Sequence, residues 1–224
     1  MQPLVSIAVP VFDTARFLPA ALDSLLAQDH RHWEALLWDD GSTDGSGRIA
    51  ADYARRDARF RLLGDGRNHG VAAAMARALD QATGDYVGVL DGDDALAPDA
   101  LSAMVAFMQA HPQLGMAYSR YVEIDEDGHD LGSGGRFRTP YSPQQLLLEF
   151  MTYHFRLVRT EAYRALGGFD PDIWVPGQIE ASVNVYEGLT RFATRRGEGG
   201  RVEIDPGRVE PHFAESWTVS PDGK

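Results

Sequence analysis

The sequence of 224 residues contains no cysteine and a single lysine, Lys224. Without cysteine, disulfides, thiolate zinc sites and cysteine nucleophiles are all excluded. No apolar run approaches the length of about 20 residues that a membrane-spanning helix requires, and the first residues do not show a basic region followed by a long apolar segment. A cytoplasmic location is therefore the default expectation, and a position at a membrane surface stays open.

Basic residues are outnumbered by acidic ones. The net charge is -12 and the isoelectric point is about 4.9. Binding to a nucleic-acid backbone requires a basic face, so we expect no nucleic-acid partner. The length and a hydrophobic content of 44% suit one sizeable α/β domain, or one domain and a fragment.

Three carboxylates stand within four positions directly after an apolar stretch, residues 86–90, that is typical of a buried strand. They are Asp91, Asp93 and Asp94. Like charges this close repel one another unless a cation lies among them. Mg²⁺ and Mn²⁺ fit best, because these hard ions take carboxylate oxygens and keep positions open for phosphate oxygens. Taken alone, the stretch also has a simpler interpretation as a solvated Asp-Gly turn.

Strand and helix patterns alternate along the first hundred or so residues, which predicts a mostly parallel, doubly wound α/β sheet. The expected strands are residues 4–9, 35–38, 60–63 and 86–90, and the expected helices are 14–26 with Thr14 as N-cap, 45–56, 71–82 and 99–109. A further strand over 116–124 and a hairpin turn at 125–128 follow.

A second acidic turn, formed by Asp39 and Asp40, falls at the carboxyl edge of the same predicted sheet, where ligands of open α/β sheets collect. Phe12 and Asp13 stand beside it. The two turns outline a nucleotide cleft in which Phe12 could stack on a base and Asp40 could accept the imide hydrogen of a uracil-like ring. The later carboxylates could hold ribose and metal.

Four segments stand in a fixed order over about a hundred residues. They are Ile7-Ala8-Val9-Pro10-Val11-Phe12-Asp13, Trp38-Asp39-Asp40-Gly41-Ser42-Thr43-Asp44, Asn68-His69-Gly70 and Leu90-Asp91-Gly92-Asp93-Asp94. Together with residues 166–170, they resemble the family 2 glycosyltransferases of the inverting GT-A type. The resemblance covers residues 2–173.

This resemblance implies a GT-A fold and the transfer of a sugar from a nucleotide-diphosphate donor, expected to be a UDP-sugar, to an acceptor hydroxyl with inversion. It implies nucleotide contacts by Pro10, Phe12, Asp13, Asp40, Asn68 and Asp93, and Mn²⁺ or Mg²⁺ binding by Asp91, Asp93 and Asp94. The acceptor, whether saccharide, lipid-linked or protein, is not indicated. Where relatives usually carry Ala-Arg-Asn, this chain has Ala74-Met75-Ala76, and Arg77 is the nearest cation.

After residue 172 the resemblance to glycosyltransferases ends. Relatives present there an acidic motif whose carboxylate takes the acceptor's proton, and Glu180 is the nearest carboxylate in register, so it is the candidate base. Residues 177–224 instead resemble an N-terminal fragment of the family 5 extracellular solute-binding proteins, through Tyr186-Glu187-Gly188-Leu189 and Ser220-Pro221-Asp222-Gly223.

We therefore expect a truncated GT-A domain over residues 1–174, joined to a short foreign α+β tail over 177–224 that is not an independent domain. In the tail we expect a helix over 182–192 and a loop over 194–208. A gene fusion, a chimeric assembly and a frame error would all produce this pattern.

Three other functions are compatible with parts of the sequence. An Asp-x-Asp phosphatase needs a downstream lysine to balance the phosphate charge, and Lys224 is the last residue. A solute-binding module needs a signal peptide and several hundred more residues. A nucleotide-sugar-binding remnant without transfer activity stays open, because the usual base motif is missing.

Overall fold

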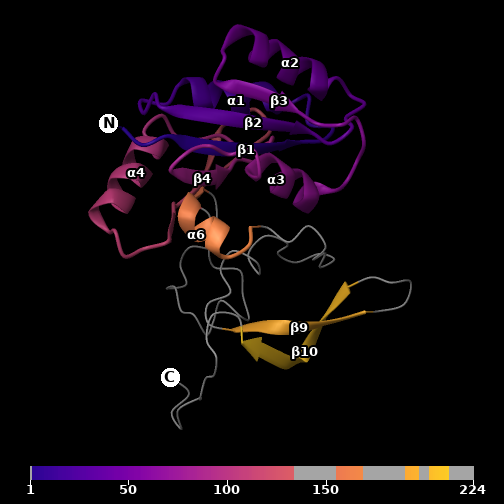
Figure 1. Cartoon of the computed structure of the whole chain (residues 1–224). Coiled ribbons are helices and arrows are strands. Elements are labelled where there is room, and N and C mark those ends of the chain that lie inside the picture. Colours follow the sequence, from indigo (N-terminus) through magenta and orange to yellow (C-terminus); the bar gives the residue numbers. More distant parts are fainter. Residues whose placement is uncertain (1, 134–154, 169–189, 197–201, 212–224) are drawn as a thin grey trace.

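The computed structural model of this protein describes residues 2–133, 155–168, 190–196 and 202–211. Its largest sheet has six strands in the order β3-β2-β1-β4-β8-β5. These strands are β1 (Val5–Val11), β2 (Trp33–Asp39), β3 (Phe60–Leu63), β4 (Tyr86–Val89), β5 (Met116–Tyr118) and β8 (Arg156–Arg159). The strands β1 to β4, which lie side by side in Figure 1, are mutually parallel. β8 runs antiparallel to β4 and β5. The mostly parallel α/β sheet predicted from the sequence is confirmed.

Helices cover both faces of this sheet, as a doubly wound fold requires. The helices α1 (Leu18–Leu26), α2 (Ser46–Arg56) and α4 (Ala100–Ala110) pack on one face, and α3 (Val71–Leu79) and α6 (Thr160–Ala165) pack on the other. Within the described ranges, every helix is too short or too polar to span a lipid bilayer.

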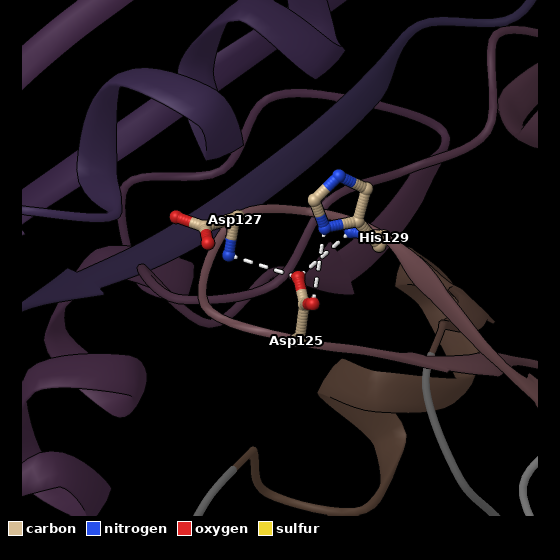
Figure 2. Close-up of side chains that lie close together, drawn as sticks. All are labelled: Asp125, Asp127 and His129. Atoms are coloured by element: carbon tan, nitrogen blue, oxygen red, sulfur yellow. Dashed lines mark hydrogen bonds and ion pairs between the residues drawn. The ribbon is translucent and has the colours of Figure 1, made fainter.

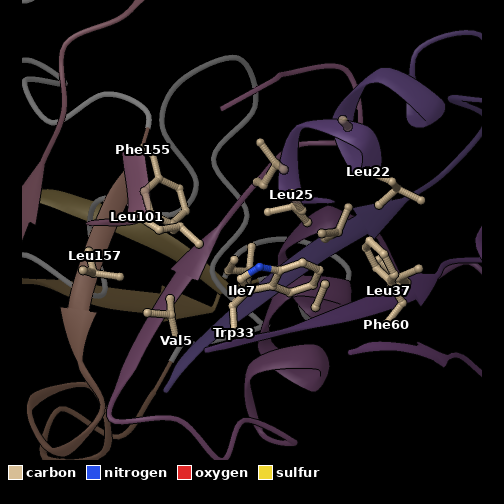
Figure 3. Close-up of a cluster of buried hydrophobic side chains, with 14 of the residues drawn as sticks. Val5, Ile7, Leu22, Leu25, Trp33, Leu37, Phe60, Leu101, Phe155 and Leu157 are labelled. Carbon is tan, nitrogen blue, oxygen red and sulfur yellow. The ribbon is translucent and has the colours of Figure 1, made fainter. Parts of the chain in front are cut away.

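The core has two parts because strand side chains alternate between the two faces of the sheet. On β1, Ile7 and Val9 belong to the larger cluster with α1, α2 and α4, whereas Ala8 belongs to the smaller cluster with α3 and α6. In the larger cluster, the rings of Trp33 and Phe60 meet edge to face with centroids 5.3 Å apart (Figure 3). The central strands are thus buried on both sides, which fixes where their carboxyl ends lie.

Helix α1 begins at Leu18. The prediction that it starts after an N-cap at Thr14 is therefore wrong. Pro19 lies in its first turn, where the N–H that proline lacks would have no partner within the helix. The carbonyl of Thr14 instead accepts the N–H groups of Phe17 and Leu18, at 3.0 and 2.9 Å. Residues 14–17 therefore form a turn between β1 and α1.

Residues 116–124 form two strands, not the single strand predicted. β5 belongs to the large sheet, and β6 (Val122–Ile124) pairs with β7 (Asp130–Ser133) in a separate hairpin. The predicted turn at 125–128 is confirmed, with the Gly128 N–H donating to the Asp125 carbonyl at 3.0 Å.

The tail also differs from the prediction. β9 (Thr190–Arg196) and β10 (Val202–Pro211) form an antiparallel pair, so residues 190–192 are not helical and most of 194–208 is not a loop. The register shifts between Asp205 and Val209, where Pro206 and Gly207 stand. Both residue types are typical of loops and of irregular positions in strands, so this stretch of the sequence does not indicate a strand.

Candidate functional site

Three neighbouring strands, β2, β1 and β4, end at one edge of the sheet. Val11 at the end of β1 pairs with Asp39, and its carbonyl accepts the N–H of Asp40 at 2.9 Å. On the other side of β1, the Leu90 N–H donates to the Ala8 carbonyl at 3.0 Å. The segment 10–15 therefore lies between the two acidic turns, at the carboxyl edge where open α/β sheets bind ligands.

Asp40 is almost fully buried, with 2% of its surface exposed. One carboxylate oxygen accepts the N–H of His69 at 2.9 Å, and the other accepts the N–H of Gly70 at 2.8 Å. Beside it, a Cβ on Gly41 would lie 3.0 Å from the backbone N of Asn68. Asp40 and its turn thus hold the loop that leads into α3.

The side chains of Asp13, Asp44 and Ser46, called the loop clamp below, join the segment after β1 to the segment after β2 by hydrogen bonds. Asp13 has a left-handed backbone (φ 47°), and its Oδ1 accepts the N–H of Thr43 at 2.7 Å and of Asp44 at 3.2 Å. In return, Oδ2 of Asp44 accepts the N–H of Ala15 at 2.8 Å. Hydrogen bonds from Ser46 and Ala15 hold the pKa of Asp44 below its usual value of 3.8.

Asp44 was not among the residues predicted for the site. The signal that could have found it is its place directly before α2, where an acidic side chain accepts the first N–H groups of a helix. Its Oδ1 does accept the N–H of Ser46, at 2.9 Å.

The remaining residues predicted to contact the nucleotide are distributed around this junction. Phe12 is 48% exposed, and Pro10 before it is half-buried. Asn68 is exposed, and its side-chain oxygen accepts the N–H of Gly70 at 3.1 Å. The exposed ring of Phe12 offers an aromatic face beside the buried Asp40 turn.

The predicted metal ligands form a tight turn after β4. The Asp94 N–H donates to the Asp91 carbonyl at 3.1 Å, Asp93 is exposed, and the other two are half-buried. Gly92 is buried, and a Cβ on it would lie 3.0 Å from Oγ1 of Thr14, so the turn packs directly on the segment after β1. Because Mg²⁺ is commonly held by one or two carboxylates and phosphate oxygens, this set of donors fits such an ion.

Among the described residues, one group of three brings candidate ligand atoms within 4.8 Å of one another, and it is not the turn after β4. It consists of Asp125, Asp127 and His129 in the β6–β7 turn (Figure 2). Asp125 Oδ1 accepts the N–H groups of Asp127 and His129, both at 2.9 Å, and these bonds are a feature of the turn itself. Nearby, Arg16 pairs with Glu126 at 2.8 Å, which connects the hairpin to the segment after β1.

Met75 stands where the resemblance places an arginine, and it is buried in α3 with 6% exposed. The guanidinium of Arg77 lies 5.6 Å from the ring centroid of Trp38 and 3.4 Å from a carboxylate oxygen of Asp65. Asp65 also lies 3.0 Å from Nε2 of His69, and this contact lowers the pKa of Asp65. Arg77, the cation closest in sequence to Met75, is therefore already in contact with Trp38 and Asp65.

Glu180, the junction at 174–177 and residues 177–189 lie outside the described residues. The geometry described above therefore does not include the acceptor side of the site, where the catalytic base is predicted.

Residues 6–167 match the model of the family described as "Glycosyl transferase family 2". The chain belongs to this family. It is 32% identical over 187 residues to the "Putative glycosyltransferase EpsE" of Bacillus subtilis, in an alignment that covers 77% of this chain and 66% of EpsE.

Solved structures share the fold of this family 2 chain. The mannosyltransferase PcManGT from Pyrobaculum calidifontis, in complex with GDP-Man and Mn²⁺, has a TM-score of 0.61 at 22% identity, covering 82% of this chain and 51% of that one. Staphylococcus aureus TarS 1-349 in complex with UDP-GlcNAc has a TM-score of 0.61 at 17% identity, covering 96% and 62%. The GT-A fold expected from the sequence is confirmed, and the chain spans only part of the length of these relatives.

Proposed function

We propose that this chain binds a nucleotide-diphosphate sugar and transfers the sugar to an acceptor hydroxyl with inversion at the anomeric carbon. The observation that carries the proposal is the position of the two acidic turns, which follow β2 and β4 and flank residues 10–15 at one edge of the sheet. The chain also belongs to family 2. PcManGT and TarS support a nucleotide-sugar donor, since their structures contain GDP-Man and UDP-GlcNAc.

The nucleotide would lie against the segment after β1. Phe12 would stack on the base with Pro10, Asp13 and Asn68 beside it, and Asp40 would accept the imide hydrogen of uracil. Each oxygen of Asp40 uses one lone pair on a backbone N–H, which leaves a second one for a ligand. This acceptor chemistry is the reason for proposing a UDP-sugar.

The turn after β4 would hold the diphosphate end of the donor. Asp91, Asp93 and Asp94 would bind Mn²⁺ or Mg²⁺, and the exposed Asp93 would also reach the ribose. Such an ion, when bound, offsets the negative charge of the departing diphosphate. The presence of Mn²⁺ in the PcManGT complex supports a divalent ion in this fold.

In the reaction, the acceptor oxygen forms a bond to the anomeric carbon while the bond from that carbon to the diphosphate oxygen breaks on the opposite face. The hydroxyl proton passes to a carboxylate, for which Glu180 is the proposed residue. General-base catalysis of this kind contributes on the order of 10²- to 10⁴-fold. Residues 1–174 would form the domain that binds the donor, and residues 177–224, which resemble a solute-binding protein, would make no contribution to donor binding.

Calorimetry with UDP tests the donor site. We expect binding in the presence of Mn²⁺, at least about tenfold weaker binding after chelation, and a similar loss in Asp94→Asn. Asp99→Asn is the matched control, because the Asp99 side chain is exposed and makes no capping bond to α4. Absence of UDP binding with Mn²⁺ present would contradict the proposal.

A second candidate function is favoured by the missing acidic motif after residue 172. If UDP binds with Mn²⁺ but no UDP-sugar is turned over to UDP with or without an added acceptor, the chain is a nucleotide-sugar-binding remnant. Release of UDP that falls in Glu180→Gln would instead support a working transferase.

A further inference from the structure

Both carboxylate oxygens of Asp44 accept hydrogen bonds that hold two loops together, which gives this side chain a task other than contacting a ligand. Its Oδ1 accepts the N–H of Ser46 at 2.9 Å and the Ser46 hydroxyl at 2.6 Å, and its Oδ2 accepts the N–H of Ala15 at 2.8 Å. The carboxylate therefore bridges the first turn of α2 and the segment after β1.

The junction has further bonds in both directions. The Thr14 N–H donates to the Ser46 hydroxyl at 2.9 Å, and the Asp13 N–H donates to the Ser42 hydroxyl at 3.3 Å. The N–H groups of Thr43 and Asp44 donate to the Asp13 carboxylate. Side chains after β2 therefore hold the backbone after β1, and Asp13 after β1 holds the backbone after β2.

Phe12 directly precedes this held stretch, and Val11 before it is fixed in β1. The backbone of Phe12 is thus fixed on both sides, while the residue stays 48% exposed. A ligand that stacks on a ring in this position does not have to order the loop when it binds, which favours affinity.

We propose that Asp44 is a positioning residue for donor binding, which acts by holding the loop that presents Phe12 to the nucleobase. The inference rests on the proposed nucleotide-sugar function and adds a residue outside its ligand set. It identifies the uracil end of the donor, rather than the diphosphate end, as the part whose binding depends on Asp44.

Asp44→Asn separates the two tasks of this side chain. The amide oxygen can still accept the two bonds from Ser46, but the NH₂ group then faces the N–H of Ala15 and cannot accept from it. We expect UDP binding with Mn²⁺ to weaken about tenfold, the order of one lost hydrogen bond to a charged group. Asp52→Asn is the charge-matched control, since Asp52 pairs only with Arg55 on the surface of α2 among the described residues.

A double-mutant cycle with Phe12→Ala decides whether Asp44 acts through Phe12. If it does, Asp44→Asn should cost about tenfold in the parent chain but less than about twofold in the Phe12→Ala chain. A purely structural contribution would weaken binding by the same factor in both backgrounds. Additive effects, or a Phe12→Ala chain that binds UDP as well as the parent, would overturn the inference.

Should Asp44→Asn fail to fold, Ser46→Ala replaces it in the same cycle. It removes the acceptor for the Thr14 N–H without changing a charge, and alanine fits the buried position. A parent chain that does not bind UDP contradicts the proposed function. A parent chain that binds UDP while both loop clamp variants bind it equally well contradicts only the inference about Asp44.

Discussion

At the scale of single residues, the acidic side chains at the sheet edge have two kinds of surroundings. Asp13, Asp40 and Asp44 accept backbone N–H groups from neighbouring loops. Asp93 is exposed and makes no hydrogen bond or ion pair with the rest of the described chain. Some of the carboxylates here therefore serve to fix loops, and at the buried Asp40 a loop N–H without a partner would be costly.

Asp40→Asn tests this loop-holding task. Asparagine keeps one acceptor oxygen, so either the His69 or the Gly70 N–H loses its partner in a buried place. We expect the free energy of unfolding to fall by about 1–3 kcal/mol and the amides of residues 69 and 70 to exchange faster. Urea denaturation and hydrogen exchange measure the two effects.

The control for this change is Asp80→Asn, an exposed carboxylate at the end of α3 that should leave both measurements unaltered. Unchanged exchange at residues 69 and 70 in Asp40→Asn would show that the loop is held by other contacts.

The sequence was sufficient to place Asp40 and the turn after β4 at one edge, because both follow apolar runs that end in acidic residues. It could not indicate which N–H groups Asp40 accepts, because His69 and Gly70 are brought to it by the packing of α3. The same holds for Asp44 and Ala15, which are 29 positions apart. Pairings between loops depend on the folded arrangement and leave no periodic signal.

At the scale of secondary-structure elements, Glu34 on β2 connects three neighbours. Its Oε1 accepts the hydroxyl of Ser6 on β1 at 2.6 Å and the N–H of Thr83 at 2.9 Å, and its Oε2 accepts from Arg61 on β3 at 3.0 Å. Burial raises the pKa of Glu34, but these hydrogen bonds outweigh burial and hold the pKa below its usual value of 4.5. The ionised form is therefore the one that joins the strands.

A depressed pKa in the folded state means that the stabilisation from Glu34 is fully present above pH 4.5 and is lost as the pH falls through the lower folded value. Glu34→Gln should therefore unfold more easily than the parent at pH 7, by about 1–3 kcal/mol, and this difference should shrink below pH 4.5. Urea denaturation at pH 7, 5 and 3.5 checks the trend. Glu123→Gln on β6, where the carboxylate is exposed, is the control, and a gap that stays constant with pH would contradict the assignment.

The apolar patterns located the strands β1 to β4 and the helices α1 to α4, but they did not always fix where each element begins and ends. β3 has the predicted bounds, because Phe60 begins a short apolar run after a helix. The first residues of β9 were assigned to a helix over 182–192. β10 was missed because Pro206 and Gly207 suggested a loop, and the bulge that accommodates them depends on the partner strand. The start of α1 was wrong because Pro19 outweighs the capping tendency of Thr14.

At the scale of the whole molecule, the described core side chains come from residues 5–163. They lie on both faces of the large sheet, and the family match over residues 6–167 covers almost the same span. The sheet that carries the candidate site is therefore complete, within the described residues, before the tail begins.

Removal of residues 177–224 is the prediction at this scale. If the tail is a passenger, the shortened chain should bind UDP with Mn²⁺ within about twofold of the parent and show a similar melting temperature, because a domain folds around its own core. Removal of residues 155–224 is the matched control. It deletes β8, which pairs with both β4 and β5, so this shorter chain should lose cooperative unfolding along with nucleotide binding. Loss of UDP binding in the longer of the two truncated chains would instead make residues 177–224 part of the transferase domain.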